Sequence, residues 1–248
     1  MANYQELTAR WDGYIQKLKD RFFEILKQAE GPLEEVINGL QYDDIVIINI
    51  KTGLNNQTVN ALAAKANEGW SFMMAEANKS GGLSWNQQQE QKAKIDVFKE
   101  WLAVEFLKFE TALYARAARK ILENVKTHIN ETKLHRCTQC GAELPINVYS
   151  FMAINLKCDS CGSVNTYQPD DRVRALEYYV IIPLAEEAAL PEKIQARTNK
   201  YAMKDYYKKY YGFLMENIPQ KKAEIRRRRR QKWRATRLPP VFRMAEFH

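Results

Sequence analysis

Glycine, proline, histidine and cysteine are all scarce in this chain of 248 residues, and each scarcity narrows what the chain can be. Ten glycines and eight prolines are few for such a length, and Ala, Leu, Lys, Glu and Gln are abundant. Because glycine and proline are the strongest helix breakers, this balance predicts a mainly α-helical fold. Hydrophobic residues make up 46% of the chain, which excludes a disordered composition.

The usual marks of a catalytic site are also missing. The chain has three histidines, His128, His135 and His248. It contains no HExxH motif, no Glu-x-x-His pair, no glycine-rich phosphate loop and no GxSxG elbow. We therefore expect no enzyme activity and no small-molecule substrate.

Long apolar runs are absent as well. The longest runs, at residues 45–48 and 180–185, are too short to span a bilayer. The sequence begins Met-Ala-Asn-Tyr-Gln-Glu-Leu, without the basic and apolar regions of a signal peptide. We therefore expect a cytoplasmic protein. In that reducing compartment, paired cysteines hold metal ions more often than they form disulfides.

Apolar residues recur at spacings of three and four, which is typical of one face of a helix. The first such series predicts a helix that ends at Gly31-Pro32, and others predict helices over residues 55–78 and about 85–130. Ser84 is a candidate cap for the last of these. A helix of 45 residues would be about 68 Å long, so it should project or run along other helices as in a coiled coil. The first series is Leu7, Trp11, Tyr14, Leu18, Phe22, Ile25 and Ala29.

Residues 45–48, Ile-Val-Ile-Ile, have strand propensity, but an isolated strand needs a partner that the neighbouring sequence does not offer. Their secondary structure stays open at this stage.

The second half of the chain returns to helical patterns. Asp170-Asp171 favours the start of a helix over residues 172–190, which Pro183 should kink. Pro191 fits the first turn of a further helix that reaches Asn217. Tyrosines and lysines are interleaved in that helix, a mixture that could stack bases. The helical spacing of its apolar residues instead favours a packed core stripe. The predicted stripe is Met203, Tyr207, Tyr210 and Leu214.

The four cysteines form two Cys-x-x-Cys pairs, Cys137/Cys140 and Cys158/Cys161. Two residues between paired cysteines let a tight turn aim both sulfur atoms at one ion, and four thiolates complete the tetrahedral shell that zinc prefers. We therefore predict one structural zinc ion. A thiol redox pair or disulfides are the alternatives for the same residues.

Gly141 and Gly162 directly follow the second cysteine of each pair, where a positive φ completes the turn. The repeated pattern Cys-Thr-Gln-Cys-Gly and Cys-Asp-Ser-Cys-Gly resembles the two knuckles of a zinc-ribbon module. The resemblance covers residues 134–168 only. It implies that all four cysteines bind the ion, and that the residues between them form a small sheet.

Alternating residues within this region predict a strand or hairpin. The even-numbered face carries Ile146, Val148, Met152, Ile154 and Leu156. On the odd-numbered face, Tyr149, Phe151 and Tyr167 would dock a protein, stack a base or pack on neighbouring helices. Basic and acidic residues balance in the ribbon, so it lacks the positive charge that phosphate contacts need.

Residues 221–237 hold ten basic residues and one acidic residue, a net charge of +9. Because the whole chain carries +8, the remaining residues carry a net charge of −1. The segment could bind nucleic acid, an acidic protein surface or an anionic membrane, or could be a solvated extension with no ligand. A membrane is disfavoured because only Trp233 offers an apolar anchor. The candidate binding residues are Lys221, Lys222, Arg226, Arg227, Arg228, Arg229, Arg230, Lys232, Trp233, Arg234 and Arg237.

Together these patterns predict a mainly α fold, an elongated helical bundle or hairpin with a small β zinc ribbon inserted. We divide it into a helical region over residues 1–133, the ribbon over 134–168, returning helices over 169–218 that pack on the first region, and a basic segment and tail over 219–248. The expected function is that of a non-catalytic, zinc-binding structural or adaptor protein of an intracellular complex. It would dock protein partners through its long helices and ribbon. The alternative is a DNA- or RNA-binding protein that uses residues 221–237.

Overall fold

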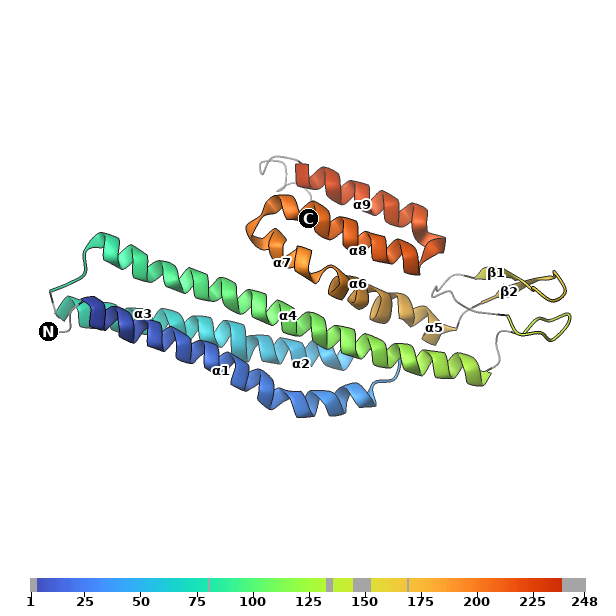
Figure 1. The fold of residues 1–248 in the computed structure, drawn as a ribbon. Helices are drawn as coiled ribbons and strands as arrows, with labels where there is room; N and C mark the ends of the chain where they lie inside the picture. Colours follow the sequence, from blue (N-terminus) through green and yellow to red (C-terminus); the bar gives the residue numbers. More distant parts are fainter. Residues whose placement is uncertain (1–3, 80, 133–135, 145–152, 169, 238–248) are drawn as a thin grey trace. The chain divides into compact units, whose positions relative to one another are not determined.

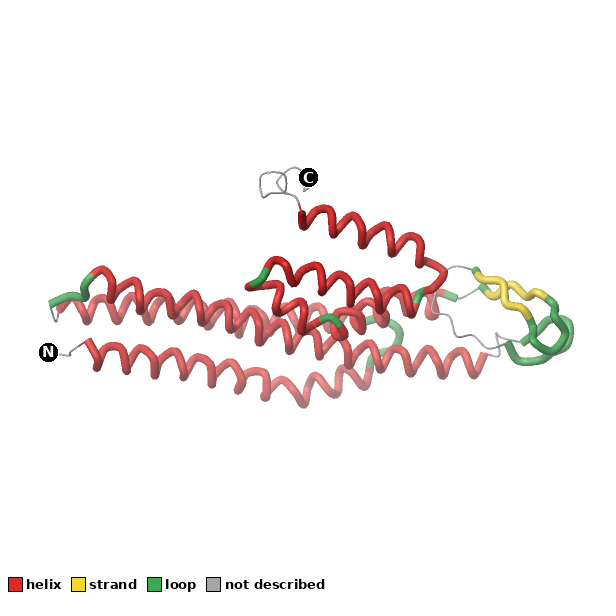
Figure 2. The backbone as a smooth tube through the Cα atoms, turned by 45° about the horizontal axis from the view of Figure 1, so that its top comes forward, coloured by secondary structure: helices red, strands yellow, loops and turns green. Residues whose placement is uncertain are grey.

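The computed structural model describes residues 4–79, 81–132, 136–144, 153–168 and 170–237. These residues are mainly helical, with one two-stranded antiparallel sheet, which confirms the predicted fold class (Figures 1 and 2). The chain forms two compact units. Unit 1 comprises residues 1–36 and 45–110, and unit 2 comprises residues 37–44 and 111–248. The boundary between the two units falls within the long helix predicted over residues 85–130, after Glu110. The four regions that we predicted are consecutive segments of the chain, and they stay a prediction.

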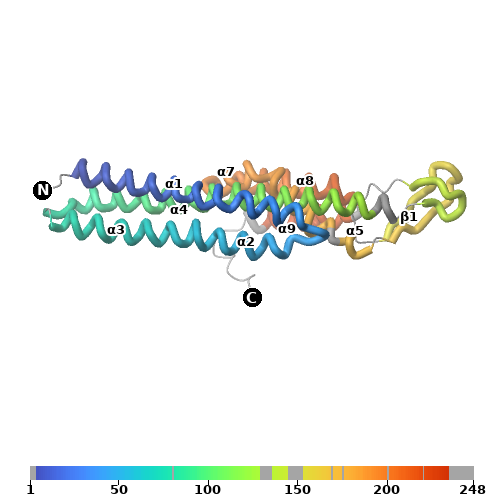
Figure 3. Tube along the Cα trace, turned by 90° about the horizontal axis from the view of Figure 1, so that it is seen from below, coloured from blue at the N-terminus to red at the C-terminus, as the bar shows by residue number. Residues whose placement is uncertain are grey.

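Unit 1 is a bundle of long helices. It contains α1 (Tyr4–Gly39) as far as Val36 and the first part of α4 (Trp85–Thr132). Between them in sequence lies the continuous series of α2 (Ile45–Asn55), the π-helical turn η1 (Asn56–Asn60) and α3 (Ala61–Lys79). Figure 3 shows these helices running side by side. The Nε1 of a buried tryptophan on α1 donates a hydrogen bond to a backbone carbonyl of α4 at 3.2 Å. The core is therefore shared among helices far apart in sequence.

Helix α1 does not end at Gly31-Pro32, so the predicted boundary is wrong. The helix continues through Pro32 to Gly39. An internal proline removes one amide donor and costs about 3 kcal/mol. Leu33 and Ile37, which follow it, are almost fully buried, and this burial offsets the cost.

Residues 45–48 are helical, and no strand forms there. Ile47 and Leu54, two turns apart on one face of α2, are buried. The helix then continues through the π turn, where the Thr58 hydroxyl donates to the Leu54 carbonyl at 2.6 Å. A strand at this position would leave its backbone groups unpaired, whereas the helix satisfies them within the segment.

Helix α4 confirms the predicted long helix and runs unbroken from Trp85 to Thr132. Ser84 caps it as expected, because its hydroxyl accepts a hydrogen bond from the Gln87 amide at 3.3 Å. The Gln87 side chain accepts one in return from the Ser84 amide at 2.9 Å. This reciprocal pair is a capping box.

Unit 2 contains the second part of α4 and a series of shorter helices. The first group consists of α5 (Asp171–Leu176), the π turn η2 (Glu177–Ile181) and α6 (Ile182–Ala188). Pro183 lies in the first turn of α6, directly after the π turn, where the α-helical hydrogen-bond pattern is already interrupted. The kink expected at this proline stays a prediction.

The second group in unit 2 is α7 (Leu190–Thr198), α8 (Met203–Asn217) and α9 (Lys222–Arg237), with short 3₁₀ turns η3 (Lys200–Ala202) and η4 (Pro219–Lys221) before α8 and α9. Pro191 lies in the first turn of α7, as expected.

The predicted single helix through Asn217 is wrong. Asn199 has an extended backbone, with φ −122° and ψ 101°, which ends α7. Its side-chain oxygen accepts a hydrogen bond from the Tyr201 amide at 3.0 Å. Asparagine often forms such local bonds, which compete with a continuous helix.

A cluster around His128 ties together the two helices that flank the ribbon in sequence. His128 on α4 is buried, and its Nε2 lies 2.7 Å from the Asp170 carboxylate. Arg172 reaches the other ring nitrogen at 3.1 Å. Asp170 also caps α5, because its Oδ1 accepts from the amides of Arg172 and Val173 at 3.0 Å. This confirms the helix start predicted at Asp170-Asp171.

Candidate metal centre and basic helix

The metal centre is built from two turns of nearly identical geometry. In each turn the first cysteine's carbonyl accepts from the following glycine's amide, at 2.9 Å for Cys137 and Gly141 and at 2.8 Å for Cys158 and Gly162. Both glycines have a positive φ, 71° and 72°, a region that other residues enter only with strain. The turns thus confirm the conformation that the glycine positions predicted.

A hairpin supports each turn. The second turn joins strands β1 (Ile154–Lys157) and β2 (Val164–Tyr167), which pair in register from Ile154↔Tyr167 to Lys157↔Val164. The first turn is closed by a single antiparallel bridge, Arg136↔Glu143. Like the Lys157↔Val164 pair, this bridge joins the residue before the first cysteine to the third residue after the second cysteine. The two cysteine turns therefore have the same local structure.

Ile154 and Leu156 on β1 are half-buried and alternate with exposed neighbours, as the even-numbered pattern predicted. Tyr167 on β2 is buried, which favours the packed alternative over docking a protein or stacking a base. Burial, together with the nearby Asp170 carboxylate, raises the pKa of its hydroxyl. The other residues of the two predicted faces, Ile146, Val148, Tyr149, Phe151 and Met152, lie outside the described residues, as does His135.

The four cysteine sulfur atoms all lie within 4.8 Å of one another. The sulfur atoms of Cys137 and Cys161 are 3.6 Å apart, and those of Cys140 and Cys158 are 3.7 Å apart. Four sulfur atoms placed tetrahedrally about 2.3 Å from a zinc ion would be separated by about 3.8 Å. The observed spacing fits such an ion, and no disulfide joins these cysteines. The structure therefore shows a four-cysteine site that could hold a metal ion such as zinc.

The site has one protected side and one open side. Cys137 and Cys158 are buried, with Leu144 completing a small apolar cluster, whereas Cys140 and Cys161 are exposed. This asymmetry leaves two ligand positions within reach of solvent or a chelator.

Two residues that the sequence analysis missed support the sulfur atoms. The Ser163 hydroxyl lies 3.1 Å from the Cys137 sulfur and 3.0 Å from the Cys161 sulfur. The buried Asn165 amide donates to the Cys137 sulfur at 3.5 Å. Its oxygen accepts from the backbone amide and the hydroxyl of Thr138, both at 2.9 Å. Asn165 therefore joins the two turns, a role that no motif around the cysteines indicates.

These contacts divide the thiols by acidity. The hydroxyl of Ser163 and the backbone amide of Cys140 lower the pKa of Cys137 to about 5. The hydroxyl and amide of Ser163 also lower the pKa of Cys161. A hydrogen bond from the Ala142 amide acts to lower the pKa of Cys140, but contact with the Cys161 sulfur and burial raise it to about 12. A divalent cation would displace the protons that remain, because thiolates are the metal-binding form.

The basic segment is not an unpacked extension. Residues 222–237 form α9, and Ile225 on its inner face is buried. The Lys221 ammonium pairs with Glu177 at 2.7 Å, and both side chains are nearly buried. Trp233 is half-buried, with the Lys204 and Arg229 cations 5.5 and 5.0 Å from its ring centroid. Although consecutive arginines point in all directions around a helix, Ile225, Arg229 and Trp233 provide a packing face at spacings of four.

The candidate binding residues thus differ in their surroundings, and Arg228 is both paired and exposed. Lys221, Arg229 and Trp233 are engaged in packing, and Arg228 pairs with Glu224 at 2.6 Å. The side chain of Arg237 lies outside the described residues. Those exposed to solvent are Lys222, Arg226, Arg227, Arg228, Arg230, Lys232 and Arg234.

The tyrosine-rich helix α8 supplies core residues, although the buried face differs from the predicted one. Tyr206, Tyr211 and Leu214 are buried, while Met203 and Tyr207 are half-buried. The Tyr206 hydroxyl donates to Glu186 at 2.9 Å, and burial raises the pKa of this tyrosine. The stripe is shifted because α8 packs on α6, α7 and α9 together.

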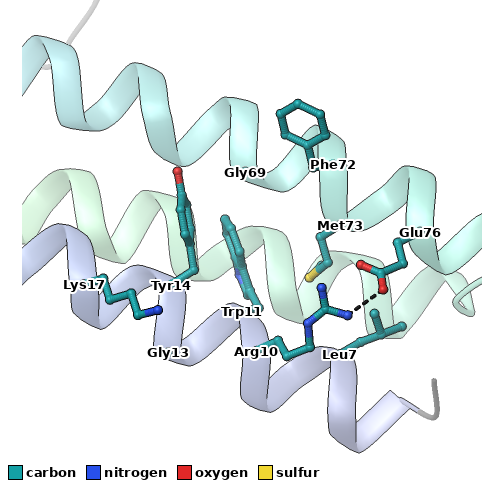
Figure 4. Close-up of a pocket in the computed structure, with 10 residues that line it drawn as sticks. All are labelled: Leu7, Arg10, Trp11, Gly13, Tyr14, Lys17, Gly69, Phe72, Met73 and Glu76. Carbon is teal, nitrogen blue, oxygen red and sulfur yellow. Dashed lines mark hydrogen bonds and ion pairs between the residues drawn. The ribbon is translucent and has the colours of Figure 1, made fainter.

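Unit 1 carries a groove that the sequence did not reveal. It lies between α1 and α3, with a volume of about 620 Å³ (Figure 4). Trp11, Tyr14 and Met73 line it, and Phe72 stands at its edge with 76% of its surface exposed. Gly69 lets the helices approach closely here, since a Cβ at this position would lie 2.4 Å from the Tyr14 ring. An ion pair between Arg10 and Glu76 borders the groove.

No family model, curated protein or solved structure matches this chain. Within the described residues, no helix combines the length and the apolar character needed to cross a bilayer.

Proposed function

We propose that the protein is a non-catalytic, zinc-binding adaptor of an intracellular complex, which docks protein partners through its long helices and zinc ribbon. The observation that carries the proposal is the aromatic groove between α1 and α3, with the exposed Phe72 at its edge. Aromatic residues and methionine are enriched at protein interfaces, where they anchor a partner's side chains in desolvated pockets. The groove suits apolar side chains presented by another protein.

The four-cysteine cluster supports the non-catalytic part of the proposal. Four protein ligands would fill a tetrahedral zinc shell, which leaves no position for a reactive water molecule. The ion would instead stabilise a ribbon whose apolar cluster, formed by Cys137, Leu144 and Cys158, is too small to fold unaided. The free cysteines are consistent with a reducing compartment.

A groove-filling variant tests the docking role. Gly13 lines the groove, and a Cβ added there meets no atom within 4 Å. We expect Gly13→Trp to fill the groove and abolish capture of partner proteins from a nuclease-treated extract of the source cell. The control is Gly53→Trp on α2, where a Cβ also meets open space. Captured proteins are identified by mass spectrometry.

Loss of the same proteins with Gly13→Trp but not with Gly53→Trp supports the adaptor role. Equal capture by both variants, or no capture by the wild-type protein after nuclease treatment, contradicts it. Nucleic-acid binding through residues 221–237, the alternative function, depends on other residues and can be tested separately.

A further inference from the structure

The charge of helix α9 opposes the folding of that helix. Lys221 and Lys222 lie at its N-terminal end, where the helix dipole disfavours positive charge. Arg226, Arg230 and Arg234 follow at spacings of four, and like charges at this spacing repel each other along a helix. Glu224 is the one acidic residue in residues 221–237. The helix is therefore stabilised by contacts elsewhere.

Those contacts are confined to one side of α9. Ile225 is buried, Trp233 is half-buried against Lys204, and Lys221 pairs with Glu177 just before the helix. Together they hold the helix against the rest of unit 2, which fixes the direction of its remaining side chains. Whatever faces solvent on α9 is thus presented by an anchored helix rather than by an unstructured tail.

The solvent side of α9 carries four arginines in one sector. Arg226, Arg230 and Arg234 lie on successive turns, about 6 Å apart along the axis, and Arg227 falls beside them at 100° per residue. All four are exposed. Within the described residues none of the four has an ion pair or a hydrogen bond from its side chain. We call these residues the four-arginine face.

The chemistry of this face favours phosphate as its ligand. A guanidinium group donates two parallel hydrogen bonds to a phosphate and remains charged at every physiological pH. No apolar side chain is exposed on α9 between Arg226 and Arg234. Protein interfaces centre on apolar and aromatic residues, and membrane-surface helices insert apolar ones, so the face fits neither partner well.

We propose that the four-arginine face binds the phosphate backbone of a nucleic acid without reading its sequence. Each arginine neutralises one backbone phosphate and releases the counterions condensed on it. Arg229 and Lys221 take no part, because they hold the helix in place. This activity is independent of the adaptor role, since it uses neither the groove nor the ribbon.

The salt dependence of binding provides a quantitative test. If four phosphates are neutralised, the logarithm of the association constant should fall with the logarithm of salt concentration. The expected slope is about −2.8 for single-stranded RNA and about −3.6 for duplex DNA. The measurement is fluorescence anisotropy of labelled, mixed-sequence RNA and duplex DNA with the full-length, zinc-loaded protein, between about 50 and 200 mM salt.

The decisive variant replaces Arg226, Arg227, Arg230 and Arg234 by glutamine, which preserves helix propensity. In the matched control, glutamine replaces four exposed lysines on other helices, Lys27, Lys79, Lys92 and Lys126. This control lowers the net charge by the same amount as the arginine variant. Circular dichroism and the unfolding temperature establish that both variants are folded. We expect the arginine variant to lose at least tenfold in affinity and most of the salt slope, and the control to keep both.

A single substitution distinguishes a loss of binding from a folding defect of the fourfold variant. Arg230→Gln alone should reduce the magnitude of the slope by about 0.7–0.9 while leaving the unfolding temperature unchanged. An equal loss in the lysine control would show that bulk charge suffices and would overturn the proposal. Absence of binding at 50 mM salt would overturn it too, as would tighter binding to anionic vesicles or to polyglutamate than to nucleic acid.

Discussion

At the residue scale, the metal centre depends on side chains that would not touch the ion. Asn165 bridges the two cysteine turns, and Ser163 contacts two of the four sulfur atoms. Such outer-shell groups fix the orientation and the charge of metal ligands, and their loss commonly weakens metal affinity by 10- to 100-fold. Neither residue belongs to the Cys-x-x-Cys pattern, so only the folded arrangement identifies them.

We predict that Asn165→Ala weakens zinc binding by about 10- to 100-fold although all four cysteines remain. The substitution removes the acceptor of the Thr138 amide and the donor to the Cys137 sulfur. Competition with a chromophoric chelator measures the affinity. The control is Asn155→Ala on β1. Asn155 is exposed, and its side-chain oxygen accepts a hydrogen bond from the Thr166 hydroxyl rather than from a group at the metal site. Equal affinities for the wild-type protein and Asn165→Ala would show that Asn165 plays no part at the site.

At the element scale, the helical hydrophobic pattern predicted where helices occur more reliably than where they end. Helix α4 follows its pattern closely, because a capping box fixes its first residue and a long apolar face fixes its length. Helix α1 passes through Pro32, and residues 45–48 are helical, because burial of Leu33 and Ile47 outweighs local preferences. Local propensity is a weak guide wherever tertiary packing opposes it.

Two glycine substitutions, one at the contact between α1 and α3 and one on α2, should change the free energy of unfolding in opposite directions. Gly69→Ala places a Cβ 2.4 Å from the Tyr14 ring, whose hydroxyl is tied to the Lys65 carbonyl at 3.0 Å. We expect this overpacking to lower the free energy of unfolding by about 1–2 kcal/mol after the gain in helix propensity. Gly53→Ala, in open space on α2, should raise it by up to about 1 kcal/mol.

Chemical denaturation with urea measures both glycine variants against the wild-type protein. A stabilised Gly69→Ala would mean that α1 and α3 are farther apart than they are here. A destabilised Gly53→Ala would mean that this position has a contact beyond those described.

At the scale of the whole molecule, the ribbon and the helices draw on different sources of stability. The helices bury extensive apolar faces, whereas the ribbon's buried cluster contains Leu144 and two of the four cysteines. Metal binding by small domains supplies folding free energy directly, on the order of 10–16 kcal/mol. The ribbon should therefore depend on its ion, and the helical units should not.

We predict about one equivalent of zinc per chain in protein purified without added metal. A strong chelator should then unfold the ribbon while the helical circular dichroism changes by less than about a tenth, since residues 134–168 contribute no helix in the described part. Hydrogen exchange should show lost protection confined to the ribbon amides. Less than a tenth of an equivalent of zinc, with four free thiols, would contradict the metal site. Unfolding of the helices by the chelator would contradict the prediction that the helical units are stable without the ion.

The sequence by itself determined the class of fold, the long helix and the convergence of the four cysteines. Each of these follows from a local pattern: a repeated spacing, a cap or a two-residue turn completed by glycine. The tertiary structure decided the course of α1 past Pro32, the bridge made by Asn165, the groove beside Gly69 and the division of the basic helix into an anchored side and a solvent side. These features depend on which surfaces meet, and surfaces meet across residues far apart in the chain, where no short-range pattern records them.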